Sequence, residues 1–166
     1  MLTNQEVAQT IADQFNEDVF DFEVPYDLLT FTTTREKIID VASYLKNHEQ
    51  YQITFLTDLT GVHYPDNAGK EFAVVYHLHS LIHNFRVRIK VFLPKEDLHI
   101  PSFTELFACA NWMERETYDF YGILFDGHPK LIRILNVEEM DYFPMRKEYP
   151  LEDATRNDKI DALFGR

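Results

Sequence analysis

The stretch FRVRIKVFL at residues 85–93 constrains the fold more than any other part of the sequence. Successive side chains of a β-strand point to opposite faces of its sheet, and apolar and basic residues alternate along this stretch. It therefore predicts a sheet with one packed face and one solvated face, which is typical of antiparallel sheets. The packed face takes Phe85, Val87, Ile89, Val91 and Leu93, and the solvated face takes Arg86, Arg88 and Lys90.

Two further strands are predicted before this one. In the segment 51–64, Tyr51, Ile53 and Phe55 are expected to share one face of a strand. The segment 71–80, EFAVVYHLHS, is apolar on both faces in its middle, which predicts a strand inside the sheet. The connections between these strands are too short for crossover helices, so antiparallel pairing is expected.

The rest of the first 122 residues predicts helices and one more β-rich region. Residues 18–34 are broken by Pro25, which indicates one or two short strands around a turn. The last helix is expected over residues 102–122, with Gly122 just past its C-terminus. The fold class is therefore α+β, with helices packed on one face of a mixed or antiparallel sheet. Three helix starts are indicated by capping-box spacings, at Thr3 with Glu6, Thr33 with Glu36, and Ser102 with Glu105.

The sequence changes character after Gly122. From Ile123 onward there is no long periodic segment, only short apolar clusters between turn residues. Such a segment is too hydrophobic to lie free in water, so a second polypeptide is expected to cover it. The sequence thus predicts two parts, an α+β globular domain at 1–122 and an extended C-terminal interaction tail without regular structure at 123–166.

Composition excludes several classes of protein. The chain has 28 acidic and 16 basic residues, a net charge of -12, so it would repel nucleic acid. One cysteine excludes a disulfide framework, a four-thiolate zinc site and a self-contained iron–sulfur cluster. No apolar run approaches the roughly 18–20 residues that cross a bilayer, and the N-terminus lacks the features of a secretory signal. A soluble, intracellular protein without a direct membrane span is expected.

Two groups of residues have a possible chemical role. His77 and His79 would share a strand face and, with His83 nearby, can chelate a divalent ion, or they are simply polar strand residues. On the last helix, Glu116 and Asp119 form a possible carboxylate pair for acid–base chemistry, and Arg115 with Asp119 has the spacing of a helical ion pair. A free-standing metal-dependent enzyme is therefore one alternative.

The run ANWMERETYDFYGILFDGHPKLIRIL at 110–135 resembles the signature of the C subunit of the proton-translocating NADH:quinone oxidoreductase, respiratory complex I. The ending YFPMRKEYPL at 142–151 is also similar to that family, and the resemblance covers about residues 25–151. The chain departs from the family pattern at His63, Met140 and the pair Tyr142–Phe143. The resemblance is to the stand-alone form of this polypeptide, not to a fusion with its neighbour.

The resemblance implies a scaffold subunit of the hydrophilic arm, with no catalytic residues, cofactor or metal of its own. NADH, FMN, iron–sulfur clusters and quinone would be bound in the assembled complex. The implied partners are the hydrogenase-like large subunit (the D subunit), near the quinone site, and neighbouring hydrophilic-arm subunits. The complex would couple electron transfer from NADH to quinone to proton translocation, with this chain peripheral on the cytoplasmic side of the inner (plasma) membrane.

The alternative within this class is the equivalent subunit of a membrane-bound hydrogenase or of a ferredoxin- or F420-linked oxidoreductase. Under either interpretation, charged and turn residues of the signature are expected to make charge-assisted bonds within the tail and across the subunit interface. These predicted interface residues are Glu114, Arg115, Glu116, Asp119, Gly127, His128, Pro129, Arg133, Arg146 and Lys147.

Overall fold

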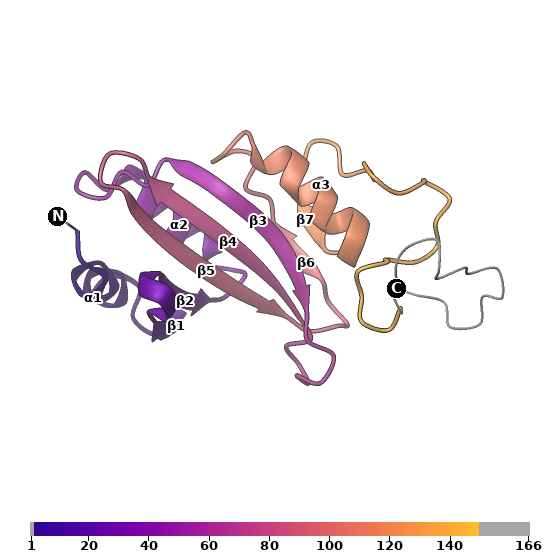
Figure 1. Cartoon of the computed structure of the whole chain (residues 1–166), viewed down its shortest axis with the longest axis horizontal. Helices are drawn as coiled ribbons and strands as arrows, with labels where there is room; N and C mark the ends of the chain where they lie inside the picture. The colour runs from indigo at the N-terminus through magenta and orange to yellow at the C-terminus, as the bar shows by residue number, and fades with distance from the viewer. Residues whose placement is uncertain (1, 150–166) are drawn as a thin grey trace, which may run out of the picture.

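The computed structural model describes residues 2–149, which fold into a mixed sheet with helices packed on one face (Figure 1). The predicted α+β class is confirmed. The helices are α1 (Asn4–Phe15), α2 (Ile38–Asn47) and α3 (Ala110–Tyr121), with short 3-10 turns at Asn16–Asp18 and Pro25–Asp27. The strands are β1 (Val19–Glu23), β2 (Leu29–Thr33), β3 (Phe55–His63), β4 (Phe72–Ser80), β5 (Phe85–Leu93), β6 (His99–Pro101) and β7 (Leu124–Asp126).

Strand β5 lies in the middle of the five-stranded sheet, whose order is β1-β2-β5-β4-β3. The residues predicted for its packed face are all buried and Arg86 on its other face is exposed, as the alternation predicts. The strands β3, β4 and β5 pair antiparallel, and β4 is buried along nearly its whole length. Strand β2 pairs with β5 in parallel, so the sheet is mixed. The buried faces of all three helices join the apolar face of this sheet in one hydrophobic core.

The predicted strand at 51–64 begins only at Phe55, and its predicted facing is partly wrong. Tyr51 and Ile53 are buried, but Phe55 is 45% exposed. The reason is the end of α2, because the N–H groups of Tyr51 and Gln52 both donate to the carbonyl of His48. These bonds form a turn directly after the helix, with Gln52 at a φ of 45°, and the alternation of a strand cannot begin there.

Of the three predicted capping boxes, the first is confirmed and the other two are wrong. The Thr3 side chain accepts from the N–H of Glu6, and Glu6 accepts from the N–H of Thr3. Thr33 instead ends β2 and its hydroxyl donates to the carbonyl of Asp18 at 2.8 Å, so α2 starts later, at Ile38. The hydroxyl of Ser102 donates to a carboxylate of α3, and that helix starts later, at Ala110.

The C-terminus of α3 matches the prediction, since Gly122 follows it with a φ of 75° and donates to the carbonyl of Tyr118. The next residues form β7, which pairs in parallel with β6, and Ile123 and Phe125 are buried in the core. Among the described residues, the part without helix or strand therefore begins at Gly127. We call residues 127–149 the docked segment, since it lies against α3 and the end of the sheet (Figure 1).

Of two predictions about the chain as a whole, only the first can be compared with the described residues. No helix formed within residues 2–149 is long and apolar enough to cross a bilayer. The end of the predicted tail, including the apolar Leu151, lies outside the described residues.

Candidate interaction site on helix α3 and the docked segment

The buried carboxylate of Asp119, near the C-terminus of α3, holds the docked segment. Its Oδ2 atom accepts hydrogen bonds from the backbone N–H groups of Ile134, Leu135 and Asn136, at 3.1, 2.8 and 2.9 Å. Its Oδ1 atom accepts from the Asn136 side-chain amide at 3.0 Å and from the Arg133 guanidinium at 2.8 Å. One side chain of the helix therefore fixes the backbone of a whole turn of the docked segment.

These contacts settle the ionisation of Asp119. Burial alone raises its pKa, but the N–H groups of Asn136 and Leu135, together with the Arg133 guanidinium, outweigh burial and hold the pKa well below 3.8. Asp119 is therefore an anion at neutral pH, paired with Arg133. The predicted helical ion pair between Arg115 and Asp119 does not occur in residues 2–149, because a cation from the docked segment occupies the carboxylate instead.

Arg133 joins the end of α3 to the far part of the docked segment. Besides the Asp119 carboxylate, its guanidinium donates to the backbone carbonyls of Asp119, Met140 and Tyr142, at 3.0, 2.9 and 3.1 Å. It also lies 5.0 Å from the ring centroid of Phe143, which is within the range of a cation–π contact. The planar guanidinium, with its several fixed donors, suits such a junction better than an ammonium group.

Arg115 makes a second, parallel attachment. Its guanidinium donates to the backbone carbonyls of Ile132 and Arg133, at 3.1 and 3.2 Å. The same group lies 4.9 Å from the ring centroid of Trp112, one turn earlier on the outer face of α3. Arg115 therefore supports the exposed Trp112 ring from one side while it holds the docked segment with the other.

Glu114 is fully buried on the opposite, inner face of α3. Its carboxyl group accepts from the hydroxyl of Ser102 at 2.7 Å and from the backbone N–H of Phe103. Burial raises its pKa from 4.5 to about 7, although the bonds from Ser102 and Phe103 lower it. Glu114 thus fixes the loop that leads from β6 to α3, and neither of these two bonds reaches the docked segment.

The raised pKa of Glu114 predicts a pH dependence of stability. Between pH 4.5 and about 7 the folded state keeps a proton that the unfolded state has lost, so stability falls as pH rises through this window. We expect the free energy of unfolding of the wild type, relative to Glu114→Gln, to decrease by about 3 kcal/mol between pH 4.5 and 8. Urea unfolding of both proteins at several pH values measures this difference, and a difference independent of pH would contradict the burial of an ionisable group at this position.

Arg146 fixes the end of the docked segment to the end of α3 and to the sheet. Its Nε donates to the carbonyl of Tyr121 at 2.8 Å, and its guanidinium lies 4.7 Å from the ring of Phe143 and 5.1 Å from that of Phe72. Gly122 is required here, because a Cβ on it would meet Phe143 Cε2 at 2.5 Å and Arg146 Nη2 at 2.6 Å. The close approach of this arginine therefore explains why the helix ends in glycine.

Lys147 contributes its backbone and leaves its side chain exposed. Its N–H donates to Nδ1 of the buried His63 at 2.9 Å, and the His63 ring stacks on Phe72 at 4.3 Å. Burial, helped by the charges of Arg146 and Lys147, lowers the pKa of His63, which keeps the ring neutral and its Nδ1 free to accept.

The three turn residues at the start of the docked segment have different roles. His128 makes a hydrogen bond with the carbonyl of Asn111 on α3 at 3.1 Å through Nε2, and its Nδ1 accepts from the N–H of Lys130. Gly127 has a φ of 84°, a conformation that glycine adopts without strain. Gly127 and Pro129 are exposed.

The structure does not bring together the residues considered for chemistry. Glu116 is exposed on α3, whereas Asp119 is buried in its own contacts with the docked segment, so they form no carboxylate pair. His77 accepts a hydrogen bond from Arg88 at 2.9 Å, and Asn84 is the partner of His79 at 3.3 Å. Within residues 2–149, no three His, Cys, Asp or Glu side chains gather as a metal would require.

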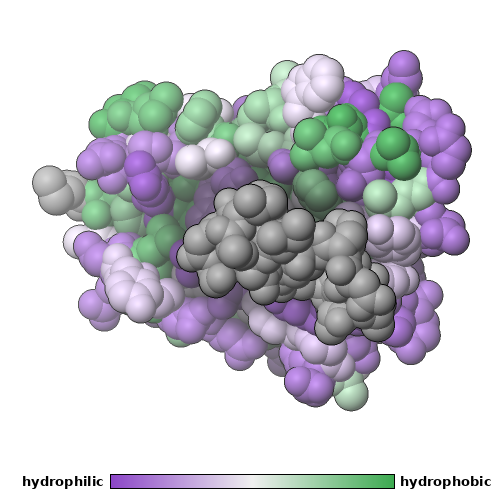
Figure 2. Space-filling model, turned by 45° about the vertical axis from the view of Figure 1, so that its right-hand side comes forward, coloured by the Kyte–Doolittle hydropathy of each residue, from purple (hydrophilic) through white to green (hydrophobic). Residues whose placement is uncertain are grey.

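The polar attachments leave apolar side chains pointing to solvent. Trp112 is 64% exposed, and Leu135 and Val137 of the docked segment are 64% and 63% exposed. Figure 2 shows hydrophobic side chains at the upper right of this view, on the side where Figure 1 places α3 and the docked segment, and a separate group at the upper left. We call this surface the apolar patch; it consists of Trp112, Ile132, Leu135 and Val137. Apolar surface on a positioned segment is typical of a protein–protein interface.

Several residues of the site carry no signal in the sequence. Asn136 and Phe143 complete the contacts of Asp119 and Arg133, but neither stands out by spacing or charge. The spacing predicts Ser102 as a helix cap, and its hydroxyl is in fact a partner of Glu114. The groups that donate to a buried carboxylate are decided by contacts in the folded chain, so no sequence signal locates these residues.

The fold and the site together define a class of protein, an α+β domain that positions an irregular segment with exposed apolar side chains, as subunits of larger assemblies do. Comparison with known proteins makes this class specific. Residues 31–155 match the model of the family described as "Respiratory-chain NADH dehydrogenase, 30 Kd subunit". The chain belongs to this family.

Relatives and solved structures agree with this assignment. The chain is 46% identical over 123 residues to the C subunit of NADH-quinone oxidoreductase from Nocardioides sp., covering 74% of this chain and 49% of that protein. It is 40% identical over 139 residues to the C subunit of the same enzyme from Mycolicibacterium gilvum, covering 84% and 62%. The chain thus spans about half to three-fifths of the length of these relatives.

Two solved structures are similar to the fold. One is described as "Nqo5 of the trypsin-resistant fragment (1-134) in P63 form", with 31% identity, a TM-score of 0.65 and coverage of 76% of this chain and 98% of that chain. The other is an archaeal membrane-bound sulfane sulfur reductase, with 24% identity, a TM-score of 0.73 and coverage of 89% and 85%. The similarity to this second structure concerns the fold alone.

Proposed function

We propose that this chain is a scaffold subunit of an NADH:quinone oxidoreductase, which uses the apolar patch and the docked segment to bind a larger subunit of the complex. The observation that carries the proposal is the combination of a backbone fixed by Asp119 and Arg133 with outward-facing apolar side chains. A segment held this way is ordered before binding, and preorganisation reduces the entropy that association must overcome.

The finer features of the proposal come from the family. The chain lies in the hydrophilic arm and docks to the hydrogenase-like large subunit, the D subunit, near the quinone site. NADH, FMN, iron–sulfur clusters and quinone bind to other subunits, and the whole complex transfers electrons from NADH to quinone and translocates protons. The residues available as metal ligands support this division of roles, because an iron–sulfur cluster needs several cysteines and this chain has one. The chain is peripheral, on the cytoplasmic side of the inner (plasma) membrane.

The individual roles of the predicted interface residues follow from their contacts. Asp119, Arg115, Arg133 and Arg146 position the docked segment, and their effect on the partner is indirect. Glu116, Pro129 and the side chain of Lys147 are exposed and are proposed to contact the partner directly. Glu114 acts furthest from the interface, through the loop before α3.

Substitution of the apolar patch tests the proposal. The tagged chain is expressed in its own cells, and its partners are isolated from solubilised membranes and identified by mass spectrometry. The double variant Trp112→Asp with Leu135→Asp should recover roughly 10- to 30-fold less of the large subunit, since buried tryptophans at interface centres are often worth about 2 kcal/mol or more.

The matched control uses apolar residues exposed elsewhere. Leu81 and Ile82, in the turn between β4 and β5, are 63% and 70% exposed. The double variant Leu81→Asp with Ile82→Asp should recover the large subunit as the wild type does. The proposal would be refuted if the double variant of Trp112 and Leu135 recovered as much of the large subunit as the wild type does. It would also be refuted if the wild-type chain were recovered with a nickel-ligating hydrogenase subunit and without an NADH-oxidising subunit.

A further inference from the structure

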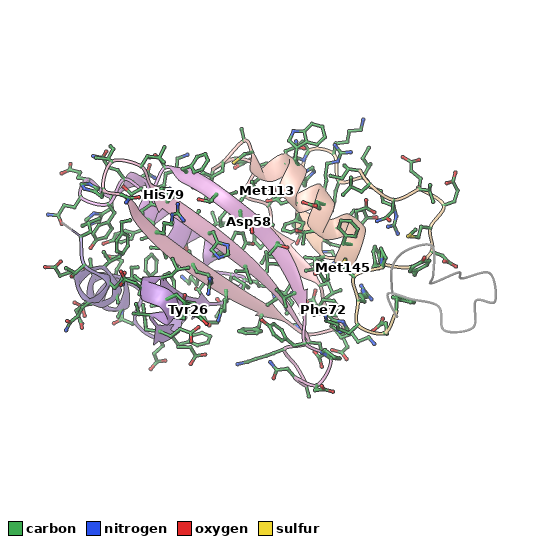
Figure 3. The ribbon with its side chains drawn as sticks, in the orientation of Figure 1. Tyr26, Asp58, Phe72, His79, Met113 and Met145 are labelled. Atoms are coloured by element: carbon green, nitrogen blue, oxygen red, sulfur yellow. The ribbon has the colours of Figure 1, made fainter. Side chains whose placement is uncertain are left out.

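A small pocket lies between the edge strand β3 and helix α3. It has a volume of about 190 Å³ and is lined by Asp58, Leu59 and Thr60 of β3, by Glu116, Thr117, Phe120 and Tyr121 of α3, and by Met145 of the docked segment. Figure 3 shows Asp58 on β3 and Met145 beside the lower end of α3. The pocket is therefore continuous with the surface that the docked segment presents.

The packing of α3 on β3 explains why this pocket exists. Helix and strand are in tight contact at Gly61, where a Cβ would lie 2.7 Å from Tyr121 Cδ2 and 3.1 Å from Thr117 Cγ2. Asp58 and Leu59, earlier on β3, line open space instead of touching the helix so closely. Within residues 2–149, β3 is an edge strand of its sheet, so the edge that pairs with no other strand is accessible to another chain.

The lining of the pocket combines two carboxylates, Asp58 and Glu116, with polar and apolar side chains. Glu116 has no hydrogen-bond or ion-pair partner within residues 2–149, unlike Glu114 and Asp119 on the same helix, whose carboxylates are satisfied internally. Asp58 is 53% exposed at its side chain, and within residues 2–149 the basic side chain nearest its carboxylate is His77, with Nδ1 at 3.7 Å. Burial and the neighbouring Arg88 lower the pKa of His77, so the ring stays neutral and does not form an ion pair with Asp58.

The size and chemistry of the pocket fit one occupant. Its volume is below the roughly 300–1,000 Å³ of sites for small-molecule ligands. A long cationic side chain suits it, because the aliphatic stem can cover Phe120 and Met145 while the charged end reaches the two carboxylates. We infer that the pocket receives a lysine or arginine side chain of the partner subunit, an inference that rests on the proposed function and names the chemistry of one contact in it.

Charge reversal in the pocket tests this inference in the full chain, with the same recovery of the large subunit from solubilised membranes as the readout. Glu116→Lys and Asp58→Lys should each reduce recovery by roughly tenfold or more, because they place a cation against a cation. The uncharged variant Glu116→Gln should have a smaller effect in the same direction. Glu105→Lys is the matched control, since Glu105 is exposed and lies outside this pocket, and it should recover the partner normally.

The outcomes separate this inference from the proposed function. Restored recovery of Glu116→Lys by a lysine-to-glutamate or arginine-to-glutamate substitution in the partner would identify the cation. Normal recovery by Glu116→Lys and Asp58→Lys, with loss by the Trp112 and Leu135 variant, overturns the inference and leaves the proposed function standing. Normal recovery by all of these variants overturns both. Thermal unfolding of each purified variant confirms that the exposed substitutions leave the fold intact.

Discussion

Replacement of Asp119 by alanine is expected to lower the free energy of unfolding by about 3–5 kcal/mol, because it leaves the Arg133 guanidinium buried without its anion. The backbone N–H groups of Ile134, Leu135 and Asn136 lose their acceptor at the same time. Asp119→Asn keeps the shape and one acceptor oxygen but loses the charge, so its effect should be intermediate.

Urea unfolding measures the change in stability, and hydrogen exchange locates it. The amides of residues 134–136 should lose protection in Asp119→Ala, whereas those of β4 and β5 should change only through the global stability. Glu105→Ala, at an exposed position, should stay within about 0.5 kcal/mol of the wild type. If Asp119→Ala were no less stable than this control, Asp119 would not be the anchor of the docked segment.

Substitution of Gly122 by alanine is expected to have the second-largest effect. The φ of 75° costs about 1–2 kcal/mol for a residue with a Cβ. The new methyl group would also meet Phe143 and the Arg146 guanidinium at under 3 Å, and overpacking of this kind typically costs about 1–3 kcal/mol more. Chemical denaturation gives the total, and a rise in exchange of the Tyr149 amide, which donates to Arg146, would show that the docked segment has shifted.

Gly69 is the matched control for this substitution. It has nearly the same φ, 78°, and open space around the position of a Cβ. Gly69→Ala should therefore show the backbone cost alone, and the difference between the two variants measures the contact with Phe143 and Arg146. A Gly122→Ala variant as stable as Gly69→Ala would mean that the docked segment adjusts without loss.

The facing of side chains in the sheet is predictable where one face of a strand is exposed to solvent. The alternation in β5 depends only on burial of one side, so it assigns the apolar residues to the correct face. The parallel pairing of β2 with β5 is not predictable in this way, because it joins segments that are distant in the sequence and leaves no local pattern. The sequence places the start of β3 too early, since the turn after α2 also buries Tyr51 and Ile53.

The helix starts show where local signals fail. A threonine or serine three residues before a glutamate predicts a capping box only if the hydroxyl has no better partner. Thr33 has one in the carbonyl of Asp18, and Ser102 has one in the carboxylate of Glu114. Both partners come from other elements of the fold, and the sequence spacing cannot reveal them.

The candidate site is predictable as a set of residues but not as an arrangement. The signature identifies Asp119, Arg115 and Arg133 as charged residues of one site, without their pairing. Helical spacing favours Arg115 as the partner of Asp119, yet Arg133 takes that place and Arg115 turns to backbone carbonyls. The contacts of these residues with a partner subunit stay predictions.

The parallel pairing of β2 with β5 also affects the order in which the chain folds during its synthesis. Strands β1 and β2 form an antiparallel pair early in the chain, but Leu29 and Thr32 find their neighbours only at Val87 and Lys90. At roughly 5–20 residues per second, a ribosome takes several seconds to make the intervening chain. During that time one edge of β2 has no strand partner, and an unpaired strand edge is a site at which another chain can pair.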